Sequence, residues 1–196
     1  MKSILKKELN DLIGFSFNTE NLGQRGIGDL IESYCIKKIK NIKNKNILIK
    51  ESTSVKSPED IQVETKDLIY KIDIKSHSID KKFSMPNLIS VDTLRKIYND
   101  NNNYIIYIFV DYTVKNNELT ITKINIRYIE ELDWSILRIS NIGRGQLQIK
   151  NANKKFIYNH QNNRDNWIIE LKKNVINFKQ KLIKKSEKCI NLWENS

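Results

Sequence analysis

Apolar residues recur at helical spacing near the N-terminus. Residues 1–13 carry apolar side chains three or four positions apart, as a helix with one buried face does. A second helical pattern runs from Leu30 to Ile39. We interpret the glycine-containing segment 23–28 before it as a loop, with Asp29 as the N-cap of the helix. Two amphipathic helices are therefore predicted before the first strand.

The middle of the chain alternates between apolar and polar residues, as half-buried strands do. Strands are predicted at 47–51, 60–64, 68–76, 104–110 and 118–129. Turn residues at 65–67 and 115–117 join two pairs of these strands into hairpins. The run 104–110 is almost wholly apolar, which is typical of a central strand covered on both faces.

Two further helices are predicted, at 87–99 between the hairpins and at 167–192 near the C-terminus. The last one combines an apolar stripe with many lysines. Helices and hairpins in this order indicate an α/β or α+β domain, with a mixed β-sheet flanked by helices. A chain of 196 residues has the usual length of one domain, so we expect residues 1–196 to form a single domain.

The net charge of the chain indicates which class of partner it binds. The chain has 34 Lys and Arg against 23 Asp and Glu, and its net charge of +11 favours an anionic partner, most often nucleic acid. Only six of the basic residues are Arg, and Ala152 is the single alanine. An AT-rich coding sequence gives the same bias, so a merely solvated basic surface is the alternative interpretation.

Several classes of protein do not fit the sequence. Cys35 and Cys189 form no CxxC pair, which suits a reducing cytoplasm. The longest apolar run, 104–110, is too short to cross a bilayer, and the polar residues near the N-terminus do not fit a signal peptide. No phosphate-binding GxxxxGK[ST] motif is present. His77, which follows the 68–76 strand, is expected to be an ordinary surface histidine.

Candidate catalytic residues lie in one hairpin. Asp73 and Lys75 are two positions apart on a strand, so their side chains project from the same face. Ile74 between them points to the other face, into a core. Asp60 lies 13 residues before Asp73, just ahead of the partner strand. Folding of this hairpin would bring two carboxylates and one ammonium group around one point.

This combination suits hydrolysis of a phosphodiester. Two carboxylates can hold Mg²⁺, a hard cation that prefers oxygen ligands and retains several waters. The metal polarises a phosphate oxygen and lowers the pKa of a bound water. The lysine stabilises the developing charge and orients the attacking water. Asp60, Asp73 and Lys75 thus fit the PD-(D/E)xK nuclease pattern, although Asp-x-Lys alone arises readily in a lysine-rich chain.

The residues around this hairpin also resemble a known family. Asp60 with Asp73-Ile-Lys75, followed by Pro86-Asn-Leu-Ile-Ser90, is similar to the D…DVKT and PNIIS elements of the HincII-like branch of type II restriction endonucleases. Gln146-Leu-Gln148 resembles the Q-I-Q strand of that family, and Arg164-Asp-Asn-Trp167 resembles its R-E-E-W element. Each match is short, but their order and spacing agree over most of the chain.

The resemblance implies a restriction-endonuclease-like core and a homodimer that grips double-stranded DNA. Such a dimer cuts both strands at a short palindrome with Mg²⁺. By position, Asp60 and Asp73 would be metal ligands together with Ile74, and Lys75 would be the catalytic lysine. Glu32, on the second predicted helix, would be an auxiliary acid. A cognate DNA methyltransferase is expected in the same system.

The same resemblance implies which residues contact DNA. Segment 83–87 would lie against the duplex, and Ser84 stands where the relative has a glutamine that wedges between bases. Loop 140–148 would enter the major groove, and Arg144 between two glycines departs from the alanine-rich stretch of the relative. Arginine can bind guanine, and asparagine or glutamine can bind adenine. The candidate DNA-binding residues are Ser84, Asn87, Asn141, Arg144, Gln146 and Gln148.

Two other functions fit the sequence. A different PD-(D/E)xK enzyme, such as a Holliday-junction resolvase or a repair nuclease, would cut only branched or damaged DNA. A restriction enzyme would instead give discrete bands from plasmid DNA. A non-catalytic basic DNA-binding module, with the acidic pair in a salt-bridge network, would bind DNA without metal-dependent cleavage.

Overall fold

The computed structural model of the chain describes residues 1–52, 57–80, 87–141, 145–150, 157–159 and 163–195. The helices are α1 (Lys2–Leu9), α2 (Gln24–Lys40), α3 (Val91–Ile97) and α4 (Arg164–Glu194). Short 3-10 helices lie at Asn10–Leu12, Ile129–Glu131 and Trp134–Ile136. The strands are β1 (Ser16–Asn18), β2 (Leu48–Glu51), β3 (Ile61–Glu64), β4 (Ile69–Ser78), β5 (Asn87–Ser90), β6 (Asn103–Lys115), β7 (Glu118–Tyr128), β8 (Leu137–Ser140) and β9 (Gln146–Ile149).

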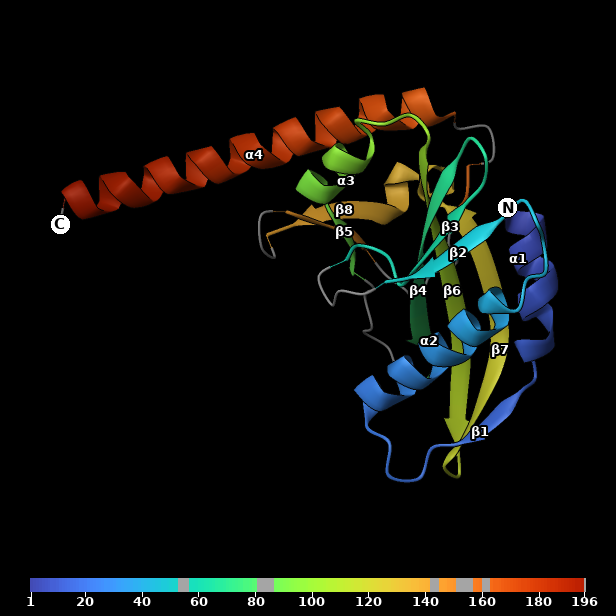
Figure 1. The fold of residues 1–196 in the computed structure, drawn as a ribbon. Coiled ribbons are helices and arrows are strands. Elements are labelled where there is room, and N and C mark those ends of the chain that lie inside the picture. The colour runs from blue at the N-terminus through green and yellow to red at the C-terminus, as the bar shows by residue number, and fades with distance from the viewer. Residues whose placement is uncertain (53–56, 81–86, 142–144, 151–156, 160–162, 196) are drawn as a thin grey trace.

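A six-stranded sheet with the order β1-β7-β6-β4-β3-β2 forms the centre of the molecule (Figure 1). β4 and β6 run parallel, and the other neighbouring pairs of this sheet are antiparallel. A smaller sheet has the order β5-β9-β8. The prediction of an α+β fold with a mixed sheet flanked by helices is therefore confirmed, and so are the two hairpins, β3–β4 and β6–β7.

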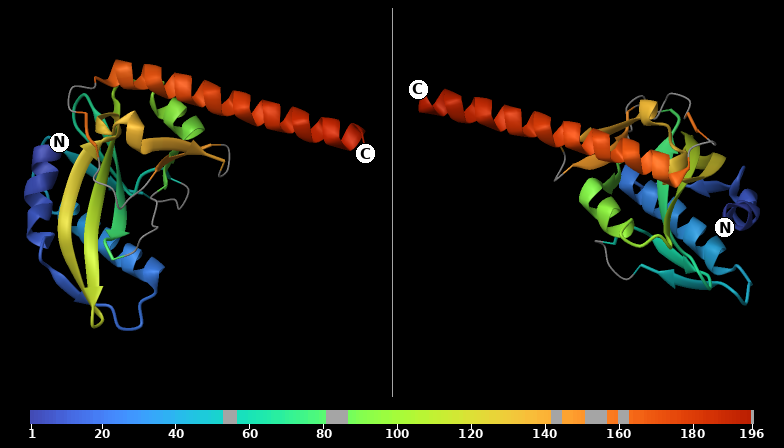
Figure 2. Two further views of the ribbon diagram at one scale, coloured as in Figure 1. Left: turned by 180° about the vertical axis from the view of Figure 1, so that it is seen from behind. Right: turned by 90° about the horizontal axis from the view of Figure 1, so that it is seen from above.

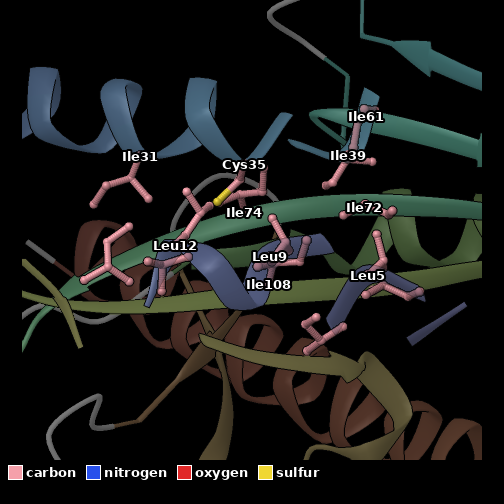
Figure 3. Close-up of a cluster of buried hydrophobic side chains, with 14 of the residues drawn as sticks. Leu5, Leu9, Leu12, Ile31, Cys35, Ile39, Ile61, Ile72, Ile74 and Ile108 are labelled. Carbon is pink, nitrogen blue, oxygen red and sulfur yellow. The ribbon is translucent and has the colours of Figure 1, made fainter. Parts of the chain in front are cut away.

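Two hydrophobic clusters cover the two faces of the large sheet. Helices α1 and α2 pack over one face, where Ile31 and Cys35 of α2 share a cluster with Ile72 and Ile74 of β4 (Figure 3). The small sheet, α3 and the first turns of α4 supply the cluster on the other side (Figure 2). The large sheet is thereby held between a layer of two helices and a layer made of the small sheet, α3 and the start of α4.

β6 is the central strand that the apolar run at 104–110 predicts. Ile106 and Ile108 belong to the cluster beneath α1 and α2, whereas Tyr107 and Phe109 belong to the cluster on the opposite side. Successive residues of a strand point to opposite faces, so this alternation means that β6 is covered on both. Each of the four side chains is at most 2% exposed.

Helix α4 is one uninterrupted helix of 31 residues, and its first half is attached to the body. Trp167 and Leu171 are buried, and Nε1 of Trp167 donates a hydrogen bond of 3.0 Å to the carbonyl of Leu132. The second half extends away from the body, with the C-terminus at its far end (Figures 1 and 2). Every residue from 183 to 195 is exposed, and we call this part the arm. No helix among the described residues is long and apolar enough to span a membrane.

The predicted loop at 23–28 is wrong, because α2 already begins at Gln24. Asp29 consequently lies inside the helix and is not its N-cap. Gly28 lies where α2 approaches β4 closely: a Cβ added to it would be 3.4 Å from Oγ of Ser76. Glycine is here a residue of helix–strand packing, which a sequence pattern cannot distinguish from a loop signal.

The segment 87–99 is a strand followed by a helix, not the single helix predicted. Strand β5 pairs with β9, and Ser90 then caps α3 by accepting a 3.1 Å hydrogen bond from the N–H of Thr93. Strand β9 lies where the family resemblance expects it. Strands β1 and β8 were not predicted from the sequence.

His77 is buried, in contrast to its expected surface position. It is 8% exposed, and its Nδ1 lies 3.2 Å from Oδ1 of Asp111, its neighbour on β6. β4 continues beyond residue 76 beside β6, and this extension of the strand encloses the imidazole.

Candidate active site

The β3–β4 hairpin brings Asp60 back to β4. Strand pairing joins Ile61 to Ile72, and the same register carried one residue further brings Asp60 opposite Asp73. The N–H of Asp60 donates to the carbonyl of Ile72 at 2.9 Å. Its carboxylate oxygen Oδ2 accepts a 2.6 Å hydrogen bond from the N–H of Ile74. Backbone contacts on both sides therefore fix Asp60 next to Asp73.

Asp73 and Lys75 form an ion pair on the same face of β4. Nζ of Lys75 lies 2.9 Å from Oδ1 and 2.7 Å from Oδ2 of Asp73. Asp73 is only 6% exposed. Its Oδ2 is buried and makes no hydrogen bond of acceptable geometry, so the ion contact with Lys75 is its only compensation among the described residues. A buried carboxylate oxygen that is compensated by one ion contact alone would gain from a bound cation.

Glu32 joins this cluster from α2. The helix packs on β4 through Ile31 and Cys35, so Glu32, next to Ile31, lies half-buried at the edge of that contact. Burial raises the pKa of Glu32, and the neighbouring Asp60 raises it further. The buried Cys35 thiol responds to the same charges: burial first, then Glu32 and Asp60, raise its pKa to about 12. The four predicted catalytic residues are thus brought together.

Electrostatics at the cluster show an excess of negative charge. Burial raises the pKa of Asp73 to about 7; Lys75 opposes this rise, whereas Asp60 and Glu32 add to it. Burial also raises the pKa of Asp60, against the effects of the Ile74 N–H and of Lys75. Among the described residues, these three carboxylates share the ammonium group of Lys75. A bound cation would relieve this imbalance, and these acids would then ionise fully.

The donor set fits Mg²⁺ better than a metal with many protein ligands. Among the described residues, no group of three or more His, Cys, Asp or Glu side chains is arranged to hold a metal ion. Mg²⁺ needs fewer, because it binds through one or two carboxylates and keeps several waters. Asp60 and Asp73 supply those carboxylates. The side chain of Ile74 is apolar and buried, so this residue can offer only its main-chain carbonyl.

Divalent cations are expected to stabilise the folded chain. At pH 8, Mg²⁺ or Ca²⁺ at about 100 times its Kd should raise the free energy of unfolding by about 2.7 kcal/mol. The gain should be smaller at pH 6, because a proton competes for Asp73. Thermal unfolding with and without cation measures both effects. Asp60→Asn should lose the gain, whereas Asp67→Asn in the exposed turn of the same hairpin should keep it; equal gains in both variants would contradict the site.

Three neighbours of the cluster, Lys71, Glu59 and Tyr107, were missed in the sequence. Nζ of Lys71 lies 3.1 Å from Oε1 of Glu59, and Glu59 raises the pKa of Asp60. Tyr107 of β6 is the strand neighbour of Asp73, and its buried hydroxyl has no hydrogen-bond partner among the described residues. Lys71 could have been found in the sequence, because it is two positions from Asp73 and so lies on the same face of β4. Nothing in the sequence marks Tyr107, because it lies in an apolar run.

Of the residues predicted to contact DNA, Asn87, Gln146 and Gln148 lie on the small sheet, and Asn141 directly follows β8. Asn87 and Asn141 are exposed, and Gln146 is partly exposed. Gln148 is 4% exposed, and its amide donates to Oδ1 of Asn87. Its Oε1 accepts a 3.2 Å hydrogen bond from Nε of Arg138, so both ends of this amide are engaged within the protein. Ser84 and Arg144 lie outside the described residues.

Comparison with known proteins identifies the fold. No family model matches the chain, and no curated protein matches it. Among solved structures, NlaIV restriction endonuclease matches with a TM-score of 0.54 at 12% sequence identity, over 88% of this chain and 78% of that one. This neighbour does not bear on the resemblance to the HincII-like branch. The chain has a restriction-endonuclease-like fold.

Proposed function

We propose that this protein is a Mg²⁺-dependent type II restriction endonuclease that cuts both strands of double-stranded DNA at a short palindrome as a homodimer. The observation that carries the proposal is the convergence of Asp60, directly before β3, with Asp73 and Lys75 of β4, and with Glu32 beside them. The restriction-endonuclease-like fold supports it. We treat residues 1–196 as one domain, and membership of the HincII-like branch of the PD-(D/E)xK nucleases as part of the same proposal.

Each residue of the cluster has a role in this reaction. When bound, Mg²⁺ supplies Lewis-acid polarisation of the scissile phosphate and a water of lowered pKa. Asp60 and Asp73, with the main-chain carbonyl of Ile74, would hold that ion. Lys75 keeps its ammonium group beside Asp73, where it stabilises negative charge on the phosphate and orients the attacking water. Glu32, with its raised pKa, would be the auxiliary acid.

A basic hollow next to the small sheet suits the DNA backbone. It lies between β8 and α4, has a volume of about 480 Å³, and contains Arg138, Lys150, Lys181 and Lys185 in its lining. Phosphates are the groups that such a set of cations binds, and this binding is sequence-independent. Base reading would fall to the neighbouring segment 140–146 and to Asn87. In this assignment Gln148 orients Asn87 and does not itself contact a base.

Arg144→Ala is expected to weaken binding to the recognition sequence by about 1–3 kcal/mol and to relax specificity at one base pair. The reason is that arginine can bind O6 and N7 of a guanine together. Binding titrations with the cognate site and with each single-base variant measure both effects. An equal loss on all sequences would instead assign Arg144 to a phosphate.

Digestion of unmethylated phage DNA with Mg²⁺, followed by sequencing of the ends, tests the proposed function. Discrete fragments with one common end sequence are the expected result. Cleavage confined to branched or damaged DNA would support a junction resolvase or repair nuclease instead. Binding without metal-dependent cleavage would support a non-catalytic DNA-binding module. Methylation by the cognate methyltransferase, expected as a partner in the same system, should protect the DNA.

A further inference from the structure

Helix α4 has a row of isoleucines that are exposed in the described part of the chain. Ile169, Ile176, Ile183 and Ile190 follow one another at intervals of seven residues. Their exposed fractions are 50%, 56%, 57% and 54%, respectively. A repeat of seven keeps side chains on one side of a helix over several turns. We call these four residues the isoleucine row.

The isoleucine row is distinct from the face by which α4 is attached to the body. That face carries Trp167 and Leu171, which are buried, and Phe178, whose ring lies near Gly145. An α-helix turns by about 100° per residue, so Ile176 and Ile183 lie on another side of the helix from Leu171. Residues of the row remain exposed even where α4 touches the body. The row is therefore a second apolar face.

The arm continues α4 beyond the turns that are attached to the body. Most helical stability in proteins comes from packing of an apolar face. Every residue of the arm, 183–195, is exposed, including Ile183 and Ile190 of the row and Leu192, which is 65% exposed. Contact with another helix along the row would stabilise it.

Charges beside the isoleucine row indicate which helix this is. Lys179 and Glu187 each lie four residues from Ile183, on opposite sides of it, and Lys172 and Glu194 each lie eleven residues from it. A two-fold axis at Ile183 would bring each lysine against the corresponding glutamate of a second, antiparallel α4. The same axis pairs Ile176 with Ile190 of the second copy.

We infer that the isoleucine row is a self-association surface, on which two copies of this chain pair their α4 helices antiparallel about Ile183. A parallel pair would instead juxtapose identical charges, Lys179 with Lys179 and Glu187 with Glu187. An anionic lipid surface suits the row less well, because Glu187 and Glu194 flank it and would face the lipid headgroups. This inference rests on the homodimer of the proposed function and names its surface; a dimer that does not cleave DNA, or a monomer that does, would separate the two proposals.

The mass of the full chain in solution tests the inference. Light scattering after size exclusion, on nucleic-acid-free protein without DNA, should give twice the 23.1 kDa of one chain for the wild type. Ile183→Asp should give one chain mass at the same concentration. Lys188→Asp, about 140° around the helix from Ile183, is the control and should remain dimeric although it changes the charge more. A monomeric wild type, or a dimeric Ile183→Asp, would overturn the inference.

Exchange of charges tests the antiparallel arrangement. Lys179→Glu and Glu187→Lys should each weaken the dimer roughly tenfold, because each puts two pairs of like charges in contact. The double variant should return to within about twofold of the wild type. Additive losses in the double variant would contradict pairing about Ile183. Binding of a monomeric wild type to phosphatidylserine-containing vesicles, lost in Ile183→Asp, would assign the row to lipid instead.

Discussion

Asp73→Asn is expected to lower the rate of Mg²⁺-dependent DNA cleavage by about 10³-fold or more while DNA affinity changes little. The variant keeps the size and the burial of the side chain but removes the charge that would hold the cation between Asp60 and Asp73. Lys75→Ala should have a comparable effect, because the ammonium group paired with Asp73 is then lost. Single-turnover cleavage gives the rate, and a binding titration in Ca²⁺ gives the affinity.

Asp67→Asn is the matched control for this experiment. It makes the same chemical change in the exposed turn of the same hairpin, and it should cleave at the wild-type rate. Cleavage by Asp73→Asn within a few fold of the wild type would remove Asp73 from the metal site. A parallel loss of cleavage and of DNA affinity would point instead to a binding defect.

The same Asp73→Asn substitution is expected to stabilise the protein at pH 8 when no divalent cation is present. Burial, with Asp60 and Glu32 nearby, raises the pKa of Asp73 from 3.8 to about 7 in the folded chain. The folded state therefore holds a proton that the unfolded state releases, and this contribution to stability is complete below about pH 4. It is lost as the pH rises through about 7. The lost free energy is roughly 4 kcal/mol, at about 1.4 kcal/mol for each unit of pKa.

Urea unfolding in EDTA at pH 4, 6 and 8 measures this effect. The stability of Asp73→Asn minus that of the wild type should be near zero at pH 4 and grow toward pH 8, because asparagine is neutral at every pH. Asp67→Asn should show no such trend. A difference that is independent of pH would mean that Asp73 does not carry the excess charge of the cluster. Cleavage and apo stability are thus expected to change in opposite directions in this single variant.

Much of the sheet could be predicted from the sequence, because strands next to helices bury one face or both. The alternation at 60–64 and 68–76 determines which side chains of β3 and β4 enter the core, and the continuous apolar run identifies β6. The short turn between β3 and β4 identifies the hairpin. These signals are local, and the structure confirms the elements that they predict.

Features that depend on contacts distant in sequence could not be predicted. Gly28 looks like a loop residue until β4 is present beside it. The segment 87–90 is apolar enough for a helix and becomes β5 only because β9 pairs with it. The burial of His77 likewise depends on β6. In each case the deciding partner lies tens of residues away.

The candidate site residues likewise divide into those with a local signal in the sequence and those without one. Asp60, Asp73 and Lys75 could be found because hairpin geometry relates them, and Glu32 only because a resemblance supplied it. The raised pKa of Asp73 has no sequence signal, since it arises from burial between two layers of the fold. Tyr107 was missed for the same reason. Sequence thus identified the charged groups, whereas the structure was needed for their energetics.

The cross-strand relation between Asp60 and Asp73 has a consequence for the far end of the hairpin. The turn after β3 is closed by hydrogen bonds between Thr65 and Leu68, including a 2.9 Å bond from the N–H of Thr65 to the carbonyl of Leu68. One residue inserted there would shift β3 by one position, and every side chain of the strand would change face. Asp60 would then move away from β4. The length of this turn should therefore tolerate no insertion, although none of its residues takes part in the chemistry.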